Sequence, residues 1–326
     1  MKSFKQITLL VLTLALMAAP FLLYFKVQAL VDWWQLRGYT PPASIVTLAN
    51  QDAMTSSAHH IFYVNHPDLE TDANQFRTDC HETEKTIVLG CYHGNQDGIF
   101  IYNVQDARLS GVQQVTAAHE MLHAAYDRLS TKDRKYVDGL LQNYFDTQLH
   151  DQRIIDTMNS YRESEPNDVV NEMHSVFGTE IANLPAPLEQ YYKRYFDNRQ
   201  AVTAFAANYQ SEFTSRSDQI KVDDAQLAQQ KAQINAEELS LQSQLNQINS
   251  DRDRLDSLRS SGQIAEYNAG VAGFNSEIAA YNNGVEKLRS DIAAYNQLVS
   301  ERNSIANELS SLTKALDTRL TPQTVQ

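Results

Sequence analysis

Apolar and polar positions follow three different patterns along the chain. The first is an apolar run over residues 7–25, about nineteen residues, which is long enough to cross the hydrocarbon core of a membrane as a helix. The second mixes short β-rich runs with helical spacing, and the third repeats apolar residues at alternating steps of three and four. These patterns predict a transmembrane segment at 1–30, a compact domain at 31–197, a coiled-coil hairpin at 198–320 and a tail at 321–326.

A small sheet is predicted before residue 110. Three runs there are rich in β-branched and aromatic residues and are separated by Pro, Gly, Asn and Asp: Ile61–Val64, Thr86–Leu89 and Ile99–Val104. The last two are expected to pair as a hairpin across residues 94–98. We interpret Ile99–Val104 as an edge strand of the sheet, with an interior position as the alternative.

The next segment has helical spacing and predicts a helix over about Gly111–Arg128. Ser130 follows it as the expected N-cap of another helix, with Asp133 three residues on in an approximate capping box. The apolar stripe of the first helix consists of Val112, Val115, Ala118, Leu122 and Ala125 or Tyr126.

The last third of the chain predicts two long helices joined by a turn at Ser260–Gly262. Tyr-Asn or Phe-Asn recurs in the second helix at positions 267, 274, 281 and 295, within a heptad a/d seam. An antiparallel coiled coil with arms of roughly 80 to 90 Å is expected. We interpret this arm as a spacer or as a docking surface for an envelope protein, and self-association through an intermolecular coiled coil satisfies the same pattern.

The motif His119-Glu120-Met121-Leu122-His123 lies within the first predicted helix. Histidines four positions apart project from one helical face and can share a zinc ion, and the adjacent Glu120 can reach a water at that metal. Zinc in a hydrolase usually has three protein ligands and one open position, so a third ligand is needed. Asp127 lies about 12 Å along the helix axis from His119, which is too far for its short side chain.

The third ligand is predicted to be Glu172, within Asn171-Glu172-Met173-His174-Ser175. This segment belongs to a helix that is expected to begin near Pro166 to Asp168 and to end at Gly178. His174, on the same helix, is the competing ligand.

Together the two segments resemble the sites of the gluzincin zinc peptidases, which are thermolysin-like. In that family an asparagine-glutamate-x-x-serine segment supplies the third zinc ligand. Thermolysin-like members have an aspartate after the serine that orients a ligand histidine, whereas this chain has Val176. The residues left to supply that contact are Asp127, Glu165 and Glu180.

This resemblance implies an α+β zincin-like fold, in which a small sheet precedes the active-site helices. It also implies metal-assisted hydrolysis of a polypeptide substrate, with Zn²⁺ held by His119, His123 and Glu172 and with Glu120 as general base. Tyr161 precedes the second helix and is a candidate donor to a tetrahedral oxyanion, with a packing role as the alternative.

The apolar run predicts where this site operates. Lys2 and Lys5 precede the run and favour a cytoplasmic amino terminus, although Lys26 weakens that bias. The chain from about residue 31 onward is then extracytoplasmic, and Trp33 and Trp34 suit a membrane–water interface. A cleaved signal peptide, which gives a secreted protein, is the alternative.

The two cysteines, Cys80 and Cys91, are predicted to form a structural disulfide in an oxidising compartment. A second metal site that uses His81 and His93 is the alternative. The paired Cys-x-x-Cys spacing typical of such sites is absent from the sequence.

Composition limits the possible functions. The chain has 326 residues, of which 42% are apolar, and this leaves room for one compact domain of about 160 residues. The net charge is −13, without a basic cluster beyond the amino terminus, which argues against a nucleic-acid partner. Two classes remain: a membrane-anchored zinc peptidase, or a non-catalytic envelope scaffold with a structural or vestigial metal site. The open fourth coordination position and the retained Glu120 favour the enzyme.

Overall fold

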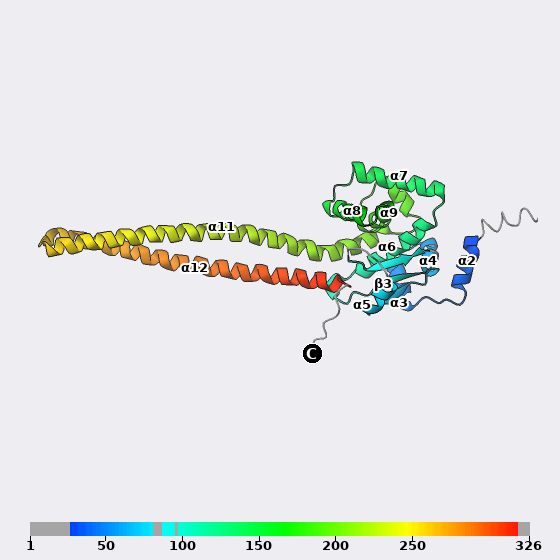
Figure 1. The fold of residues 1–326 in the computed structure, drawn as a ribbon, viewed down its shortest axis with the longest axis horizontal. Coiled ribbons are helices and arrows are strands. Elements are labelled where there is room, and N and C mark those ends of the chain that lie inside the picture. The colour runs from blue at the N-terminus through cyan, green and yellow to red at the C-terminus, as the bar shows by residue number, and fades with distance from the viewer. Residues whose placement is uncertain (1–26, 81–86, 95–96, 319–326) are drawn as a thin grey trace, which may run out of the picture. The chain divides into compact units, whose positions relative to one another are not determined.

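The computed structural model describes residues 27–80, 87–94 and 97–318, which form two units (Figure 1). The first, called here the compact unit, consists of the chain up to Ser211 together with the residues from Lys314 onward. The second, the hairpin unit, consists of Glu212–Thr313. The compact unit contains the sheet and the short helices, and the hairpin unit is entirely helical apart from its tip.

Four short helices lie in the first part of the compact unit: α2 (Val27–Leu36), α3 (Ala43–Gln51), α4 (Ser56–Tyr63) and α5 (Ala73–Asp79). The predicted strand Ile61–Val64 is wrong, because these residues form the end of α4 and its C-cap. Thr55 caps the start of α4, and Ala58, Ile61 and Phe62 are buried at helical spacing. Packing of this face against α6 (Val112–Asp127) outweighs the β-propensity of the individual residues.

The sheet has three strands in the order β1-β3-β2, where β1 is Asp68–Glu70, β2 is Gly90–His93 and β3 is Gly98–Tyr102. Strand β1 pairs with β3 in parallel, and β2 pairs with β3 as an antiparallel hairpin. The predicted strand Ile99–Val104 thus corresponds to β3, but its edge position is wrong because β3 is central. The strand predicted at 86–89 occurs later, at β2; Thr86 lies outside the described residues.

Five helices follow the sheet: α6, α7 (Thr131–Thr147), α8 (Gln152–Ser164), α9 (Val169–Glu180) and α10 (Ala186–Tyr192). The prediction for α6 is confirmed: Gly111 caps its start with a φ of 106°, which favours glycine, and Arg128 is its C-cap. Ser130 caps α7 as predicted, by accepting a hydrogen bond from the backbone of Asp133.

Helix α9 begins near the predicted position but continues past Gly178, where its end was predicted. A Cβ atom on Gly178 would lie 2.6 Å from Leu122 Cδ1 and 2.7 Å from Tyr192 Cε1. The glycine therefore permits the close approach of α9 to α6 and α10, and its role is packing rather than helix termination.

Helix α6 is the centre of the compact unit, because it contacts α3, α4, α9, β2 and β3. Its residues Ala117, Ala118, Met121 and Leu122 are fully buried. They share one core with large side chains from the surrounding elements: Phe62, Ile99, Ile101, Phe177 and Tyr192. This packing holds the histidine-bearing face of α6 in a fixed position.

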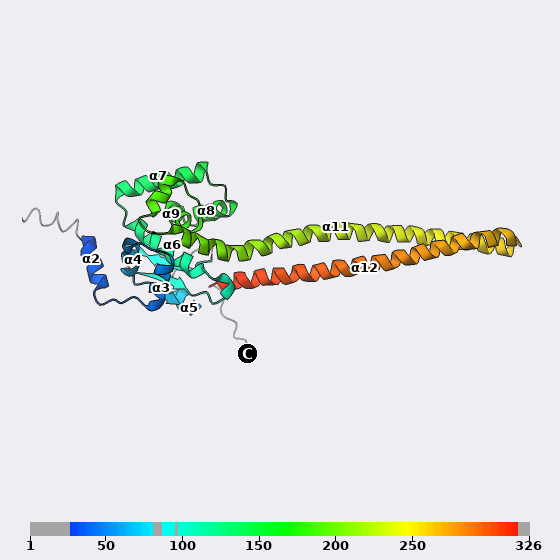
Figure 2. The same ribbon diagram turned by 180° about the vertical axis from the view of Figure 1, so that it is seen from behind.

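The predicted antiparallel helix pair is confirmed as α11 (Arg199–Ser260) and α12 (Ile264–Leu316), which run side by side in Figures 1 and 2. Within the hairpin unit, Leu255 and Leu241 of α11 are buried at close approaches to Gly270 and Gly284 of α12. Ile264, a predicted seam residue at the tip, is half exposed. The seam is therefore tightest where a leucine faces a glycine.

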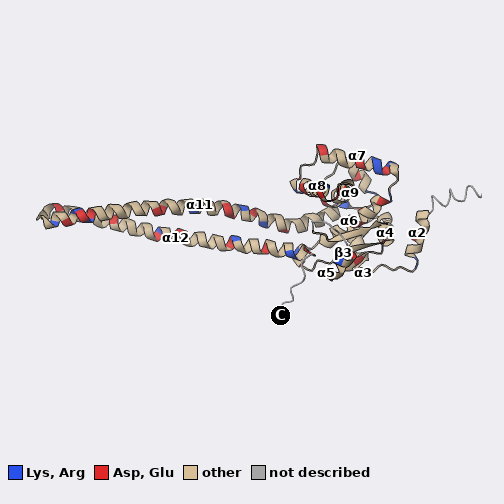
Figure 3. Cartoon of the chain, viewed as in Figure 1, with Lys and Arg blue, Asp and Glu red and all other residues tan. Residues whose placement is uncertain are grey.

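Charges of both signs are interspersed along the two long helices (Figure 3). Three ion pairs join α11 to α12: Arg216–Glu308 at 3.0 Å, Arg302–Asp224 at 2.9 Å, and Lys287–Glu237. One side chain of each pair is well exposed to solvent, so these pairs contribute little to stability and mainly fix the register.

The predicted transmembrane segment, residues 7–25, lies outside the described residues. Within the part of the chain that is described, no helix combines the length and the apolar character that a membrane crossing requires.

Asp52, the C-cap of α3, is fully buried, and neither carboxylate oxygen has a hydrogen-bond partner among the described residues. Burial raises the pKa of Asp52 well above its ordinary value. Folded protein therefore retains this proton to higher pH than unfolded protein. The carboxylate lowers the stability of the fold progressively as pH rises from about 3.9, by about 1.4 kcal/mol per pH unit until the folded-state pKa is reached.

Asp52→Asn is therefore expected to increase the free energy of unfolding at neutral pH, with an advantage that grows as pH rises above about 4. Denaturant unfolding of both proteins across this range measures the difference. The exposed residue Asp146, changed to Asn, is the matched control and should show no such trend. An advantage for Asp52→Asn that does not change with pH would contradict the assignment.

Candidate metal centre

Two packed helices of the compact unit bring together the three predicted ligands. His119 and His123 lie one turn apart on α6, and Glu172 lies in the first turn of α9. The close approach that Gly178 allows sets these helices against each other. The group formed by His119, His123 and Glu172 can hold a metal ion, as predicted.

Both histidines direct Nε2 toward the Glu172 carboxylate. The two Nε2 atoms are 3.0 Å apart. Nε2 of His123 is 3.4 Å from Oε1 of Glu172, and Nε2 of His119 is 3.6 Å from Oε2. Three donor atoms thus converge on one point from two elements that are about fifty positions apart in the sequence.

Glu172 is only 5% exposed, yet its Oε2 atom accepts no hydrogen bond from the described residues. A buried carboxylate oxygen without a donor is costly unless a cation is close to it. The cation that this oxygen requires is either a metal ion at the point where the three side chains meet or the protonated His119, whose Nε2 is 3.6 Å away.

Without a metal ion, the protonated histidines and the Glu172 carboxylate stabilise one another's charged forms. Burial opposes protonation of His119, but its interaction with Glu172 and the charge of Glu120 outweigh burial and raise the pKa of His119 to about 9. Burial likewise opposes ionisation of Glu172, but His123 and His119 outweigh it and lower the pKa of Glu172. A metal ion must therefore displace a proton from His119 when it binds.

Glu120, the predicted general base, is buried beside Gly90 of strand β2. A Cβ atom on Gly90 would lie 2.7 Å from Oε1 of Glu120 and 2.4 Å from Cγ2 of Thr116. Any larger residue at position 90 would therefore require Thr116 and Glu120 to move. The sequence offered no signal for this role, because Gly90 stands in no recognisable turn motif.

His119, His123 and Glu172 line a cavity of about 490 Å³. Its wall includes the ligands, Glu120, residues of β2, and Tyr209 at the start of α11. Tyr161 of α8, the predicted oxyanion donor, also lines the cavity, where it helps to lower the pKa of Glu172. Tyr209 was not predicted, because it lies far along the chain in a segment with the periodicity of the coiled coil.

The three acids proposed to orient a ligand histidine have different surroundings. Asp127 contributes to a raised pKa of the Tyr92 hydroxyl, after burial, and Glu180 pairs with Arg153 at 2.6 Å. The charge of Glu180 nevertheless contributes to the raised pKa of His119. Glu165 lies with Asp168 in a second carboxylate group that shares Glu172.

His174, the competing ligand, lies in different surroundings from the other two histidines. It is fully buried, and its Nε2 is 2.9 Å from the Tyr191 hydroxyl. The rings of Tyr126, Tyr191 and Tyr192 surround it. Burial lowers the pKa of His174 to about 3, so it is neutral, and it serves as a packing and hydrogen-bonding residue behind the site.

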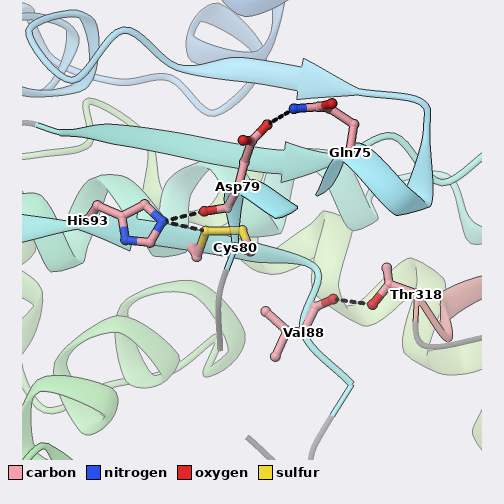
Figure 4. Close-up of a disulfide and its surroundings, with 7 residues drawn as sticks. Gln75, Asp79, Cys80, Val88, His93 and Thr318 are labelled. Atoms are coloured by element: carbon pink, nitrogen blue, oxygen red, sulfur yellow. Dashed lines mark hydrogen bonds between the residues drawn. A yellow bond between two sulfur atoms is a disulfide. The ribbon is translucent and has the colours of Figure 1, made fainter. Parts of the chain in front are cut away.

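A disulfide fixes the strand that passes Glu120. Cys80, the C-cap of α5, is joined to Cys91 of β2 as predicted, so neither thiolate is available as a metal ligand (Figure 4). His93 Nε2 lies 2.7 Å from the carbonyl oxygen of Asp79, and the Thr318 hydroxyl donates to the Val88 carbonyl at 3.2 Å. The disulfide indicates an oxidising compartment.

No protein-family model, no curated protein and no solved structure matches this chain.

Proposed function

We propose that this chain is a membrane-anchored, extracytoplasmic zinc peptidase with a gluzincin-like site. The spacing of the three donor atoms carries the proposal. Ligands at about 2.0 to 2.2 Å from a tetrahedral zinc ion are about 3.3 to 3.5 Å from one another. The two Nε2 atoms are 3.0 Å apart, and His123 Nε2 and His119 Nε2 lie 3.4 and 3.6 Å from Oε1 and Oε2 of Glu172 respectively, which is close to that spacing. Two imidazoles and one carboxylate are a donor set typical of catalytic zinc.

Zinc at this site supplies a Lewis acid that polarises a peptide carbonyl and lowers the pKa of a water molecule. The residues of the chain perform the proton transfers. The Glu120 carboxylate accepts the proton of the attacking water and delivers it to the leaving amine. Tyr161 lines the cavity beside Glu172, and its hydroxyl would donate to the developing oxyanion.

A polypeptide substrate is proposed to lie along β2. One edge of this strand pairs with β3, and no strand pairs with the other edge within the described ranges. Residues of β2 line the cavity, and Gly90 abuts Glu120. An extended peptide that added a strand to β2 would therefore pass the proposed base with its backbone hydrogen-bonded.

Metal analysis and peptide cleavage by the purified full chain test this proposal. One zinc ion per chain is expected, together with cleavage of a peptide library that a chelator abolishes and added zinc restores. Cleavage that persists without metal, or a protein that binds no zinc, contradicts it. Stoichiometric zinc without cleavage of any peptide would instead support the non-catalytic scaffold.

Gly90→Ala is expected to reduce kcat by about 10-fold to 10²-fold while zinc content stays unchanged. The new methyl group overlaps the Glu120 carboxylate, so that the base must move while the three ligands remain in place. Steady-state kinetics and metal analysis measure the two effects.

Gly94→Ala is the matched control, because its Cβ atom would only touch Oδ2 of Asp127, at an ordinary 3.7 Å. The double variant Gly90→Ala, Thr116→Ser removes the competing overlap with the threonine methyl group and should remain slow. Recovery of natural activity in that double variant would show that Thr116, not Glu120, was displaced.

A further inference from the structure

Helix α2 has the opposite burial pattern to an ordinary surface helix. Asp32 is its one buried residue, at 5% exposure. Trp33 and Trp34 are 59% and 66% exposed. Val27, Leu30, Val31 and Trp34 follow the i, i+3, i+4, i+7 spacing of a single helical face, and all four are exposed. A charged side chain therefore faces the protein while the large apolar side chains face away from it.

Polar contacts fix this orientation. Asp32 accepts two hydrogen bonds from Arg128, at 3.0 and 2.9 Å, and lies 2.8 Å from Nε2 of His60. His66 Nε2 lies 2.8 Å from the carbonyl oxygen of Gln35 at the other end of the helix. Arg128 is the C-cap of α6, so these contacts join α2 to the end of the helix that bears the metal ligands.

The Asp32 carboxylate remains charged in this contact. Burial would raise its pKa, but the hydrogen bonds from Arg128 and His60 outweigh burial and hold the pKa well below its usual range. A bidentate pair between a guanidinium and a carboxylate is specific in its geometry. Helix α2 therefore cannot turn its apolar face inward without breaking this pair between the buried Asp32 and the partly buried Arg128.

The exposed face has the chemistry of a membrane-interface segment. Asp32 is the only acid in α2, so the outward face carries no negative charge, although the whole chain has a net charge of −13. The guanidinium of Arg37 lies 5.5 Å from the centre of the Trp33 ring. Tryptophan with an adjacent cation is typical of the headgroup region, and the sequence just before α2 is the apolar run of residues 7–25.

A protein partner fits this face less well. A ten-residue helix is about 15 Å long and about 10 Å across, which is far below the roughly 800 Å² per partner of a stable protein interface. A short apolar face beside an apolar chain segment needs no more area than this to enter a lipid interface.

We propose that the exposed face of α2 lies in the interface of a lipid bilayer, and that the contact between Asp32 and Arg128 holds the end of α6 at a fixed position relative to that surface. The proposal concerns attachment and does not depend on whether the metal centre is catalytic.

The two tryptophans of the chain are Trp33 and Trp34, so tryptophan fluorescence, excited at a wavelength that the sixteen tyrosines do not absorb, reports on this helix alone. The full chain is reconstituted in phosphatidylcholine vesicles with or without lipids brominated near the top of the acyl chain. Tryptophan emission at shorter wavelength than in water is expected, with loss of intensity in the brominated vesicles and protection from iodide. Quenching by iodide and not by brominated lipid overturns the proposal. A blue shift that depends on protein concentration and not on lipid also overturns it, in favour of a second copy.

A tryptophan on the opposite side of α2 is the control that distinguishes contact of the exposed face with lipid from mere proximity of the helix to the bilayer. In a Trp33→Phe, Trp34→Phe background, Leu36→Trp places the probe on the opposite side of α2, where it should escape lipid quenching. Equal quenching of both positions contradicts a face-on arrangement.

Asp32→Asn is expected to keep the lipid contact but to increase amide hydrogen exchange around Arg128, and unchanged exchange overturns the coupling to α6. Glu120→Gln should quench like the natural chain, so that failure of this proposal and failure of the proposed activity are seen separately.

Discussion

A Glu120→Gln protein is expected to bind one zinc ion per chain and to hydrolyse peptides about 10²-fold to 10⁴-fold more slowly than the natural chain. The amide has nearly the same shape as the carboxylate and fits the same space beside Gly90. It cannot accept the proton of the attacking water, so only the general-base step is lost. Metal content measured by mass spectrometry and kcat/KM for one cleaved peptide report the two halves of this expectation.

Glu163→Gln is the matched control, because Glu163 is an exposed glutamate of α8 outside the cavity wall. It should retain both zinc and activity. Natural activity in purified Glu120→Gln protein would remove Glu120 from the mechanism, whereas loss of zinc from it would show that this residue supports the ligands instead.

His123→Ala is expected to lower zinc affinity by more than about 10²-fold, because loss of a residue that merely supports a ligand already costs about 10-fold to 10²-fold. Zinc at 100 times its dissociation constant stabilises the natural fold by about 2.7 kcal/mol, and this increment should vanish in the variant. Titration against a competing chelator measures the affinity, and thermal unfolding with and without zinc measures the stability.

His150→Ala and His174→Gln separate ligand loss from other effects. His150 is exposed and should be neutral in both measurements. His174→Gln removes the imidazole that bonds Tyr191, and so should lower the stability of the metal-free protein without changing zinc affinity. A loss of affinity in His174→Gln as large as that in His123→Ala would make His174 the third ligand in place of Glu172.

Local sequence signals were sufficient to predict helix α6 and the start of α9, which carry the candidate metal ligands. The caps around α6 and α7 are side-chain and glycine effects that act within a few residues, and the apolar stripe of α6 has regular spacing. The convergence of Glu172 on the two histidines came from the resemblance of its segment to a known site. Helix spacing alone cannot bring together residues so far apart.

The errors occurred where tertiary packing decided the structure. Ile61–Val64 has strand-forming residues but is helical, because α4 packs its buried face on α6. β1 has three residues, too few for an alternating pattern to be recognised, and its parallel pairing with β3 makes β3 the central strand. Gly178 resembles a helix end in sequence, and only the neighbouring Leu122 and Tyr192 reveal it as a contact point.

The chain leaves and re-enters the compact unit close to the wall of the cavity. The first part of the compact unit ends at Ser211, and its second part begins at Lys314. In the second part, the Thr318 carbonyl accepts a hydrogen bond from Arg77, and the Thr318 hydroxyl donates one to the carbonyl of Val88, a residue of the cavity wall. Everything between is an insertion with two points of attachment. A single cut at the tip, near Gly262, would leave both arms tethered, and pulling on them would load the two attachment points together, one beside Tyr209 and the other beside Val88.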